Sequence, residues 1–381
     1  MDNILNSMSL IHSLRVIPKA FLRTLFVLLN NAYCIPTYVI WMILLFPLRK
    51  LNPDAYWRIE GYFFHWLLAM VSMWSWSAGY DIVEMGDDIR KCLDERTLVI
   101  VNHQSTADVP MLMACFNAKP NVLPNIMWIM DRVFKFTNFG IVSVMHKDFF
   151  IVAGKNTREK SLLDLTNHLY EVFIPLQRKW MVLFPEGGFL RKRRATSQRY
   201  AVKNNLPVLY HVTLPRIGAM KNILSVMSPN GFESGNNNVQ QDDPRQMNLT
   251  PLDRLTWVVD ITVAYPEGQP LDLPTIVFGN RQPCKTLFFY RTYRIEDLPK
   301  DEDSLFKWLC ARFVEKEEML ETFYRTGYFP YSTYSKTPMP PQEVSQDCLR
   351  FVMLHLFFIA STYIHYQMFY AAYEYYTYLT H

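Results

Sequence analysis

Residues 98–108 read Leu-Val-Ile-Val-Asn-His-Gln-Ser-Thr-Ala-Asp, and this stretch decides the fold around it. Its apolar start predicts a buried strand, and residues 107–116 have the apolar spacing of a helix. The turn between them would bring the Asp108 carboxylate back toward His103. Histidine can remove a proton from a hydroxyl near neutral pH, and a carboxylate on its other ring nitrogen fixes its orientation. We therefore predict that His103 is a general base oriented by Asp108; the alternative is a histidine that only stabilises the turn.

A second motif follows another apolar run. Residues 180–188 read Trp-Met-Val-Leu-Phe-Pro-Glu-Gly-Gly, which predicts a strand over 180–184 and a turn at Glu186. Glycine tolerates positive φ angles and lets the backbone approach a ligand closely. Backbone amides at Gly187 and Gly188 are therefore expected to stabilise the oxyanion that forms when a carbonyl carbon is attacked; amides near the His103 turn are the alternative donors.

Arg191, Lys192, Arg193 and Arg194 form the densest run of charge in the chain. Arginine binds phosphates through paired hydrogen bonds, so we expect Arg191, Arg193 and Arg194 to hold substrate phosphates beside the glycine turn. The alternatives are a solvated surface and a nuclear localisation signal, and the second of these conflicts with the membrane segments described below.

Short apolar runs alternate with helical patterns through the middle of the chain, which indicates an α/β fold. The expected strands are 97–101, 126–129, 149–152, 180–184, 207–213, 257–264 and 287–293, and the expected helices are 107–116, 157–173 and 302–324. Residues 228–248 are rich in Gly, Asn, Asp and Gln, and they predict a mobile surface loop.

Both ends of the chain are apolar and predict membrane helices. Residues 25–47 satisfy the ~20 apolar residues that a span requires. Residues 62–80 are expected to form an interfacial or re-entrant helix, with a second span or a buried core helix as alternatives. Residues 351–373 contain no Lys, Arg, Asp or Glu and predict a transmembrane helix rather than a docked amphipathic one.

These segments divide the chain into three parts. We expect membrane-anchoring helices in 1–85, a catalytic domain in 86–330 and a C-terminal segment with a membrane helix in 331–381. A formal net charge of only +4 over 381 residues gives no support to nucleic-acid binding. The six cysteines lack any C-x-x-C pair, which argues against a disulfide framework or a zinc site, and we expect no metal.

The N-H-x-x-x-x-D block followed by F-P-E-G resembles the glycerolipid acyltransferase family. The resemblance covers roughly residues 95–220 and implies a mixed sheet flanked by helices. It implies transfer of a fatty acyl group from acyl-CoA to a hydroxyl of a lysophospholipid or glycerol phosphate, with acyl-CoA as co-substrate and no other cofactor. Because the attacking hydroxyl belongs to the substrate, Ser105 and Thr106 are not required as nucleophiles.

The chain departs from the family pattern after the second block. The family has an arginine just after a Phe-Ile pair, whereas Val-Ala-Gly at 152–154 follows Phe150-Ile151 here. Lys147, Lys155 or Arg158 are the candidates for the missing phosphate-facing charge.

A second departure concerns the glycine turn. The family assigns its Glu-Gly block to acceptor binding and commonly has Thr and Arg after it, where this chain has Gly188 and Phe189. The resemblance therefore implies that Glu186 either binds the acceptor or orders basic residues around its phosphate.

Residues 128–131, 134–143 and 184–194 look like a narrower group, the acyltransferases that act on lysophosphatidylglycerol, with lysocardiolipin acyltransferases as near relatives. This implies an enzyme of the endoplasmic reticulum membrane whose site faces the cytosol and whose partners are acyl-CoA, a lysophospholipid and membrane lipids. Lysophosphatidylethanolamine or another lysophospholipid is the alternative acceptor. Two other functions stay open: a CoA-independent phospholipid transacylase and a non-catalytic membrane scaffold that binds anionic lipid.

Overall fold

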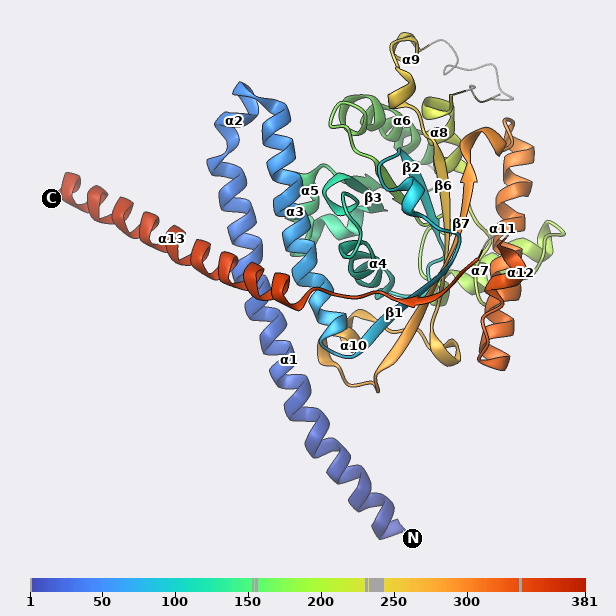
Figure 1. Cartoon of the computed structure of the whole chain (residues 1–381), viewed down its shortest axis with the longest axis horizontal. Helices are drawn as coiled ribbons and strands as arrows, with labels where there is room; N and C mark the ends of the chain where they lie inside the picture. Colours follow the sequence, from blue (N-terminus) through green and yellow to red (C-terminus); the bar gives the residue numbers. More distant parts are fainter. Residues whose placement is uncertain (1, 153, 155–156, 230–231, 233–242, 336–337) are drawn as a thin grey trace.

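The computed structural model describes residues 2–152, 154, 157–229, 232, 243–335 and 338–381, with side chains from residue 16 onward. Over these residues, eight strands form one mixed sheet in the order β4-β3-β5-β2-β6-β7-β1-β8 (Figure 1). The strands are β1 (Tyr80–Gly86), β2 (Thr97–Val101), β3 (Ile126–Asp131), β4 (Phe149–Ile151), β5 (Trp180–Leu183), β6 (Trp257–Ala264), β7 (Cys284–Arg294) and β8 (Met339–Glu343). The predicted α/β fold with a mixed sheet is confirmed.

Helices cover both faces of this sheet (Figure 1). The α-helices are α1 (Asp2–Leu44), α2 (Phe46–Leu51), α3 (Pro53–Trp76), α4 (Asp108–Asn117), α5 (Gly140–His146), α6 (Arg158–His168), α7 (Leu190–Lys203), α8 (Gly218–Met227), α9 (Pro244–Met247), α10 (Leu273–Phe278), α11 (Glu302–Thr326), α12 (Tyr331–Tyr334) and α13 (Cys348–Thr380). A π-helix, Leu169–Phe173, continues α6, so that the helical segment ends where the predicted helix 157–173 ends.

The central strands are buried on both faces, which explains their nearly continuous apolar sequences. In β2, Val99 and Val101 face a core shared with α3 and α4, whereas Leu98 and Ile100 face a core shared with α6, α8 and α11. Strands β2, β3, β5 and β6 run parallel, so their carboxyl ends meet at one edge of the sheet, here called the carboxyl edge.

Six of the seven predicted strands correspond to strands of the sheet, but the strand expected at 207–213 is wrong. The backbone amides of Tyr210, His211 and Val212 donate to the carboxylate of Glu317 in α11, at 2.6, 2.7 and 3.0 Å. A side chain of a helix therefore takes the place of a neighbouring strand as hydrogen-bond acceptor.

The apolar ends form long helices that extend beyond the α/β body (Figure 1). Two helices of the described chain are long and apolar enough to cross a membrane, Val16–Leu44 within α1 and Cys348–Thr380, which is α13. They correspond to the first and third apolar segments of the sequence, and they indicate a membrane-associated protein.

The second apolar segment, 62–80, is built into the core of the protein. Most of it forms the carboxyl half of α3, which packs against α4 and buries Phe64, Leu67, Met70 and Trp74. The alternative of a buried core helix therefore describes α3, and the expected interfacial helix does not.

The sheet extends beyond residues 86–330, because β1 and β8 at its edge come from the flanking segments. The boundaries of the three predicted parts remain predictions. Within 228–248, residues 244–247 form the short helix α9, whereas 230–231 and 233–242 lie outside the described residues. The mobile loop therefore also remains a prediction.

Candidate active site

Three side chains meet at the carboxyl edge because each lies within three residues of the end of one of three adjacent parallel strands. His103 follows β2, Glu186 follows β5 and Tyr265 follows β6. The buried Asn102 extends the β2–β6 pairing with its side chain, since its amide donates to Val263 O (3.0 Å) and accepts from Val263 N (2.7 Å). The backbone that leads into His103 is therefore held in one position.

Asp108 is the acceptor around which the turn is organised. Its Oδ2 accepts hydrogen bonds from His103 Nδ1 (2.8 Å), Gln104 N (2.6 Å) and Ser105 N (2.9 Å). Its Oδ1 accepts from the Tyr265 hydroxyl at 2.7 Å. Asp108 also begins α4, where the helix dipole favours a negative charge. The structure thus brings together the two residues of the predicted pair, buried and in contact.

This arrangement fixes which nitrogen of His103 is available. A carboxylate can only accept, so Nδ1 carries the proton that it donates to Asp108, and Nε2 of the neutral ring carries the lone pair. No hydrogen bond joins Nε2 to any residue in the described part of the chain. The ring stacks on Phe184 (centroids 4.2 Å apart) and meets Phe189 edge-on (4.5 Å). The ring is therefore oriented from two sides while Nε2 remains unoccupied.

Glu186 is buried and binds backbone rather than reaching toward a substrate. Its Oε1 accepts from His103 N at 2.6 Å, and its Oε2 accepts from Thr213 N (2.8 Å) and the Thr213 hydroxyl (2.7 Å). Burial raises the pKa of Glu186 to about 7. Within the described chain, Glu186 forms no ion pair with an arginine, so its geometry favours bracing the His103 turn.

The two glycines after Glu186 differ in what their amides can do. Gly187 has φ +70° and Gly188 has φ +152°, which few other residues adopt. Gly187 N already donates to Phe184 O at 3.1 Å, whereas Gly188 N has no partner among the described residues. The amides of His103, Gln104 and Ser105 are also occupied. Of the two glycine amides, Gly188 N–H is therefore the one left unoccupied within the described chain.

Arginine side chains lie against both glycines. A Cβ on Gly188 would stand 3.3 Å from Cγ of Arg193, and a Cβ on Gly187 would stand 3.4 Å from the guanidinium of Arg216. Neither arginine has an ion pair within the described ranges. Arg193 was predicted; Arg216 was missed, although its place just after Pro215 in the turn that follows 207–213 is a usable signal.

The other predicted basic residues are not seen to contact the glycine turn. Arg191 and Arg194 are exposed on α7, and within the described residues no hydrogen bond or ion pair joins either side chain to the glycine turn. Lys147 ends α5 in the left-handed conformation, where its carbonyl accepts from His168 Nε2 at 3.0 Å. Arg158 lies beside Gly218, since a Cβ on Gly218 would stand 3.2 Å from Nη2 of Arg158. Lys155 lies outside the described residues.

No group of three or more His, Cys, Asp or Glu side chains that could hold a metal ion occurs among the described residues.

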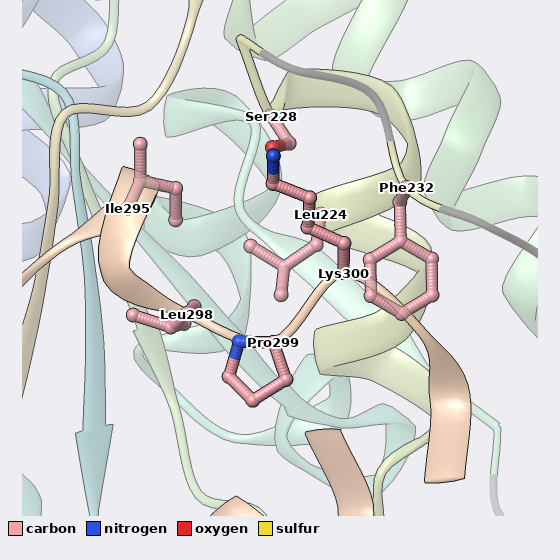
Figure 2. Close-up of a pocket in the computed structure, with 7 residues that line it drawn as sticks. All are labelled: Leu224, Ser228, Phe232, Ile295, Leu298, Pro299 and Lys300. Atoms are coloured by element: carbon pink, nitrogen blue, oxygen red, sulfur yellow. The ribbon is translucent and has the colours of Figure 1, made fainter. Parts of the chain in front are cut away.

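A small pocket lies between α8 and the segment after β7, apart from the candidate active site (Figure 2). It is lined by Leu224, Ser228, Phe232, Ile295, Leu298, Pro299 and Lys300. It lies at the opposite edge of the sheet from His103, because Ile295 N bonds to Thr256 O just before β6.

Tyr265 is a positioning residue that the sequence did not indicate. Its hydroxyl is fully buried, and burial raises its pKa, so it remains a donor to Asp108 Oδ1. Tyr265→Phe should lower kcat about tenfold while KM changes little, because Asp108 loses one donor and holds His103 less firmly. Steady-state kinetics of the purified protein measures both constants. A matched control is Tyr328→Phe, an exposed tyrosine; equal effects of the two changes would contradict the positioning role.

Comparisons with known proteins agree with this geometry. The chain matches the family described as Acyltransferase over residues 82–209 and that described as Acyltransferase C-terminus over residues 276–355. It is 44% identical over 353 residues to Acyl-CoA:lysophosphatidylglycerol acyltransferase 1 of Homo sapiens, covering 92% of this chain and 93% of that protein. The Mus musculus protein of the same name is 46% identical, covering 83% and 84%.

A more distant relative matches over a smaller part of the chain. Lysocardiolipin acyltransferase 1 of Gallus gallus is 25% identical over 283 residues, covering 74% of this chain and 68% of that protein. No solved structure gives a significant match. From the two matched regions and the high identity over most of its length, this chain belongs to the acyltransferase family and is an enzyme that transfers acyl groups.

Proposed function

We propose that this enzyme transfers a fatty acyl group from acyl-CoA to a free hydroxyl of lysophosphatidylglycerol. The observation that carries the proposal is the buried His103–Asp108 pair, whose Nε2 is unoccupied at the carboxyl edge. The choice of donor and acceptor is supported by the names of the two relatives at 44% and 46% identity. Acyl-CoA serves as co-substrate, and no further cofactor is involved.

The chemistry follows from the positions of these groups. The acceptor hydroxyl approaches Nε2 of His103, which removes its proton as the oxygen attacks the thioester carbonyl carbon. Asp108 stabilises the imidazolium that results. Gly188 N–H donates to the oxyanion of the tetrahedral intermediate. The carbon–sulfur bond then breaks, and the thiolate of CoA takes the proton from the imidazolium, which leaves the ester and free CoA.

Glu186 acts through the backbone in this scheme. By accepting from His103 N and from Thr213, it ties the His103 turn to the segment that ends at Arg216. Any shift of this segment would therefore move the general base and the arginine together. The bracing role replaces direct acceptor binding by Glu186 in this proposal.

Acceptor phosphate is assigned to Arg193 and Arg216, because these arginines lie against the glycine turn. Lys155, Arg191 and Arg194 are assigned to CoA phosphates or anionic headgroups. Lys147 is not, because the neighbouring His146 bonds to Ile126 O at the start of β3, at the edge of the sheet opposite His103. The enzyme is assigned to the endoplasmic reticulum membrane, with the carboxyl edge facing cytosolic acyl-CoA.

Replacing Arg216 by glutamine should raise KM for lysophosphatidylglycerol roughly tenfold and change kcat little, because a charge-assisted bond to the acceptor is lost. Initial rates over a series of acceptor concentrations measure this. The matched control is Arg199→Gln, an exposed arginine further along α7 that is assigned no phosphate, which should leave KM within about twofold. A larger effect at Arg199 than at Arg216 would contradict the assignment.

The function itself is tested with purified protein in nanodiscs, one acyl-CoA and a panel of lysophospholipids, with products identified by mass spectrometry. The expected result is fastest product formation with lysophosphatidylglycerol. Product formed from a phospholipid donor, and none from acyl-CoA, would identify a transacylase instead. Lipid binding without turnover of any acceptor would identify a scaffold.

A further inference from the structure

A run of apolar side chains is exposed where the chain leaves β3. Residues 131–138 are all exposed, and they contain the short 3-10 helix η3 (Arg132–Phe136). Within η3, Val133 is 70% exposed and Phe136 is 78% exposed, and Phe134 between them is also exposed. Contiguous exposed apolar residues mark a binding surface more often than isolated ones do. We call Val133, Phe134 and Phe136 the η3 surface.

The outward orientation of these side chains is fixed by the local backbone. Asp131 caps η3 by accepting from Val133 N at 2.9 Å, and Thr137 N and its hydroxyl both donate to Phe134 O, at 3.1 and 2.8 Å. Gly140 lets the start of α5 pack against this loop, since a Cβ there would lie 2.1 Å from Lys135 O. The η3 surface is therefore an ordered projection.

The η3 surface lies at the carboxyl edge, on the same side of the sheet as the His103–Asp108 pair. Trp128 of β3 pairs with Val182 of β5, so the two strands end side by side. Glu186 follows the end of β5 and η3 follows the end of β3. Whatever contacts the η3 surface is thus held close to the candidate active site.

The η3 surface is also close to a helix that could cross a membrane. The helix that follows it, α5, packs against α1 and α3 (Figure 1). Phe139 at the start of α5 meets Trp74 edge-on at 6.0 Å, and Trp74 Nε1 donates to Asn30 of α1 at 3.3 Å. The η3 surface is therefore linked through Phe139 and Trp74 to α1, one of the two helices that are long and apolar enough to cross a membrane.

Two cations alternate with the apolar side chains. Arg132 and Lys135 are exposed and form no ion pair within the described ranges. Apolar side chains flanked by basic ones fit the interface of an anionic leaflet. The apolar side chains enter the boundary between headgroups and acyl chains, and the basic side chains bind lipid phosphates. A second copy of the chain would offer no such match, because this chain is itself basic, with a net charge of +4.

We propose that the η3 surface inserts into the interface of an anionic lipid leaflet and holds the carboxyl edge against it. The purpose of this contact rests on the proposed function, because a lysophospholipid acceptor would reach His103 from that leaflet. The contact itself does not depend on which acceptor is used.

The contact is tested with the full chain in nanodiscs of phosphatidylcholine with a minority of phosphatidylglycerol. In a Cys348→Ser background, which removes the exposed cysteine, Val133→Cys or Phe136→Cys is labelled with the environment-sensitive dye NBD. We expect blue-shifted emission that spin-labelled lipids quench and aqueous iodide does not. The control is Leu252→Cys, which is 86% exposed and lies before β6 at the opposite edge, where iodide alone should quench.

Two outcomes would overturn the proposal. Quenching at residue 133 or 136 by iodide alone would show that the η3 surface stays in water. Shielding from both quenchers would show that a protein, such as a second copy, covers it. Both readouts are independent of acyl transfer, so they remain decisive even if the proposed function fails.

A functional arm uses the double variant Val133→Asp with Phe136→Asp, which replaces exposed side chains only. We expect acyl transfer to fall about tenfold with acceptor embedded in nanodiscs. With acceptor and enzyme in detergent micelles, we expect the rate to stay within about twofold of the wild type. An equal loss in both media would show that these residues act on the site itself and not through the leaflet.

Discussion

His103→Ala will lower the rate of acyl transfer by about a thousandfold while the protein stays folded. The expected loss follows from removing the group whose Nε2 takes the acceptor proton. Folding should survive because the turn is held by main-chain groups: His103 N donates to Glu186 at 2.6 Å, and His103 O accepts from Leu190 N at 2.8 Å. The measurement is kcat in nanodiscs with acyl-CoA and lysophosphatidylglycerol, alongside thermal unfolding of the same preparation.

The matched control is His211→Ala. His211 is also close to the site, since its carbonyl accepts from the Gln104 side chain at 2.7 Å, but its ring pairs with Glu321 at 2.6 Å. We expect this change to cost less than about tenfold in rate. Added imidazole should partly restore His103→Ala, because the lost ring leaves a slot between Phe184 and Phe189. A rate for His103→Ala within tenfold of the wild type would remove His103 as the base.

The part of the fold that sequence could predict is the part set by local pattern. Strand β2 is recognisable because both of its faces are buried, and the His103–Asp108 contact follows from five residues of spacing across one turn. The formation of buried central strands and of a strand–turn–helix unit depends on residues that are close together in the sequence. For the same reason, Gly187 and Gly188 could be recognised as the turn after β5.

The features that sequence missed depend on partners distant in the chain. Segment 207–213 has the composition of a strand, but its amides bond to Glu317, more than one hundred residues later. The sequence of helix α3 resembles a membrane segment because it is rich in aromatic side chains. It is held in the core by Glu60, which pairs with His146 (2.8 Å) and Arg178 (3.1 Å). Neither partner can be chosen from the sequence of α3.

The same limit applies to the candidate site. Arg193 belongs to a visible basic run, and helix periodicity alone does not say which of its members meets the glycine turn. Arg216 reaches this turn because Arg216 N donates to Pro185 O at 2.8 Å, a long-range contact. Selecting the arginines that face the site therefore required the tertiary structure.

Asp108→Asn is expected to lower kcat roughly a hundredfold to a thousandfold, with the shape of the site preserved. An asparagine oxygen at the position of Oδ2 can still accept from His103 Nδ1, Gln104 N and Ser105 N. Its NH2 can then donate to the Tyr265 hydroxyl oxygen, which now accepts. Tautomer and orientation of His103 are retained, so the loss isolates one contribution, the negative charge that stabilises the imidazolium.

The control for this change is Asp272→Asn, another Asp at the start of a helix near the site. Asp272 caps α10 by accepting from Thr275 N at 2.8 Å, and asparagine caps helices equally well. The rate of acyl transfer by the Asp272→Asn variant should therefore equal that of the wild type. The decisive comparison is the double variant His103→Ala with Asp108→Asn. If Asp108 acts only through His103, the double variant is no slower than His103→Ala alone. Losses that multiply instead would mean that Asp108 contributes to the reaction independently of the imidazole, and the two residues would not form a functional pair.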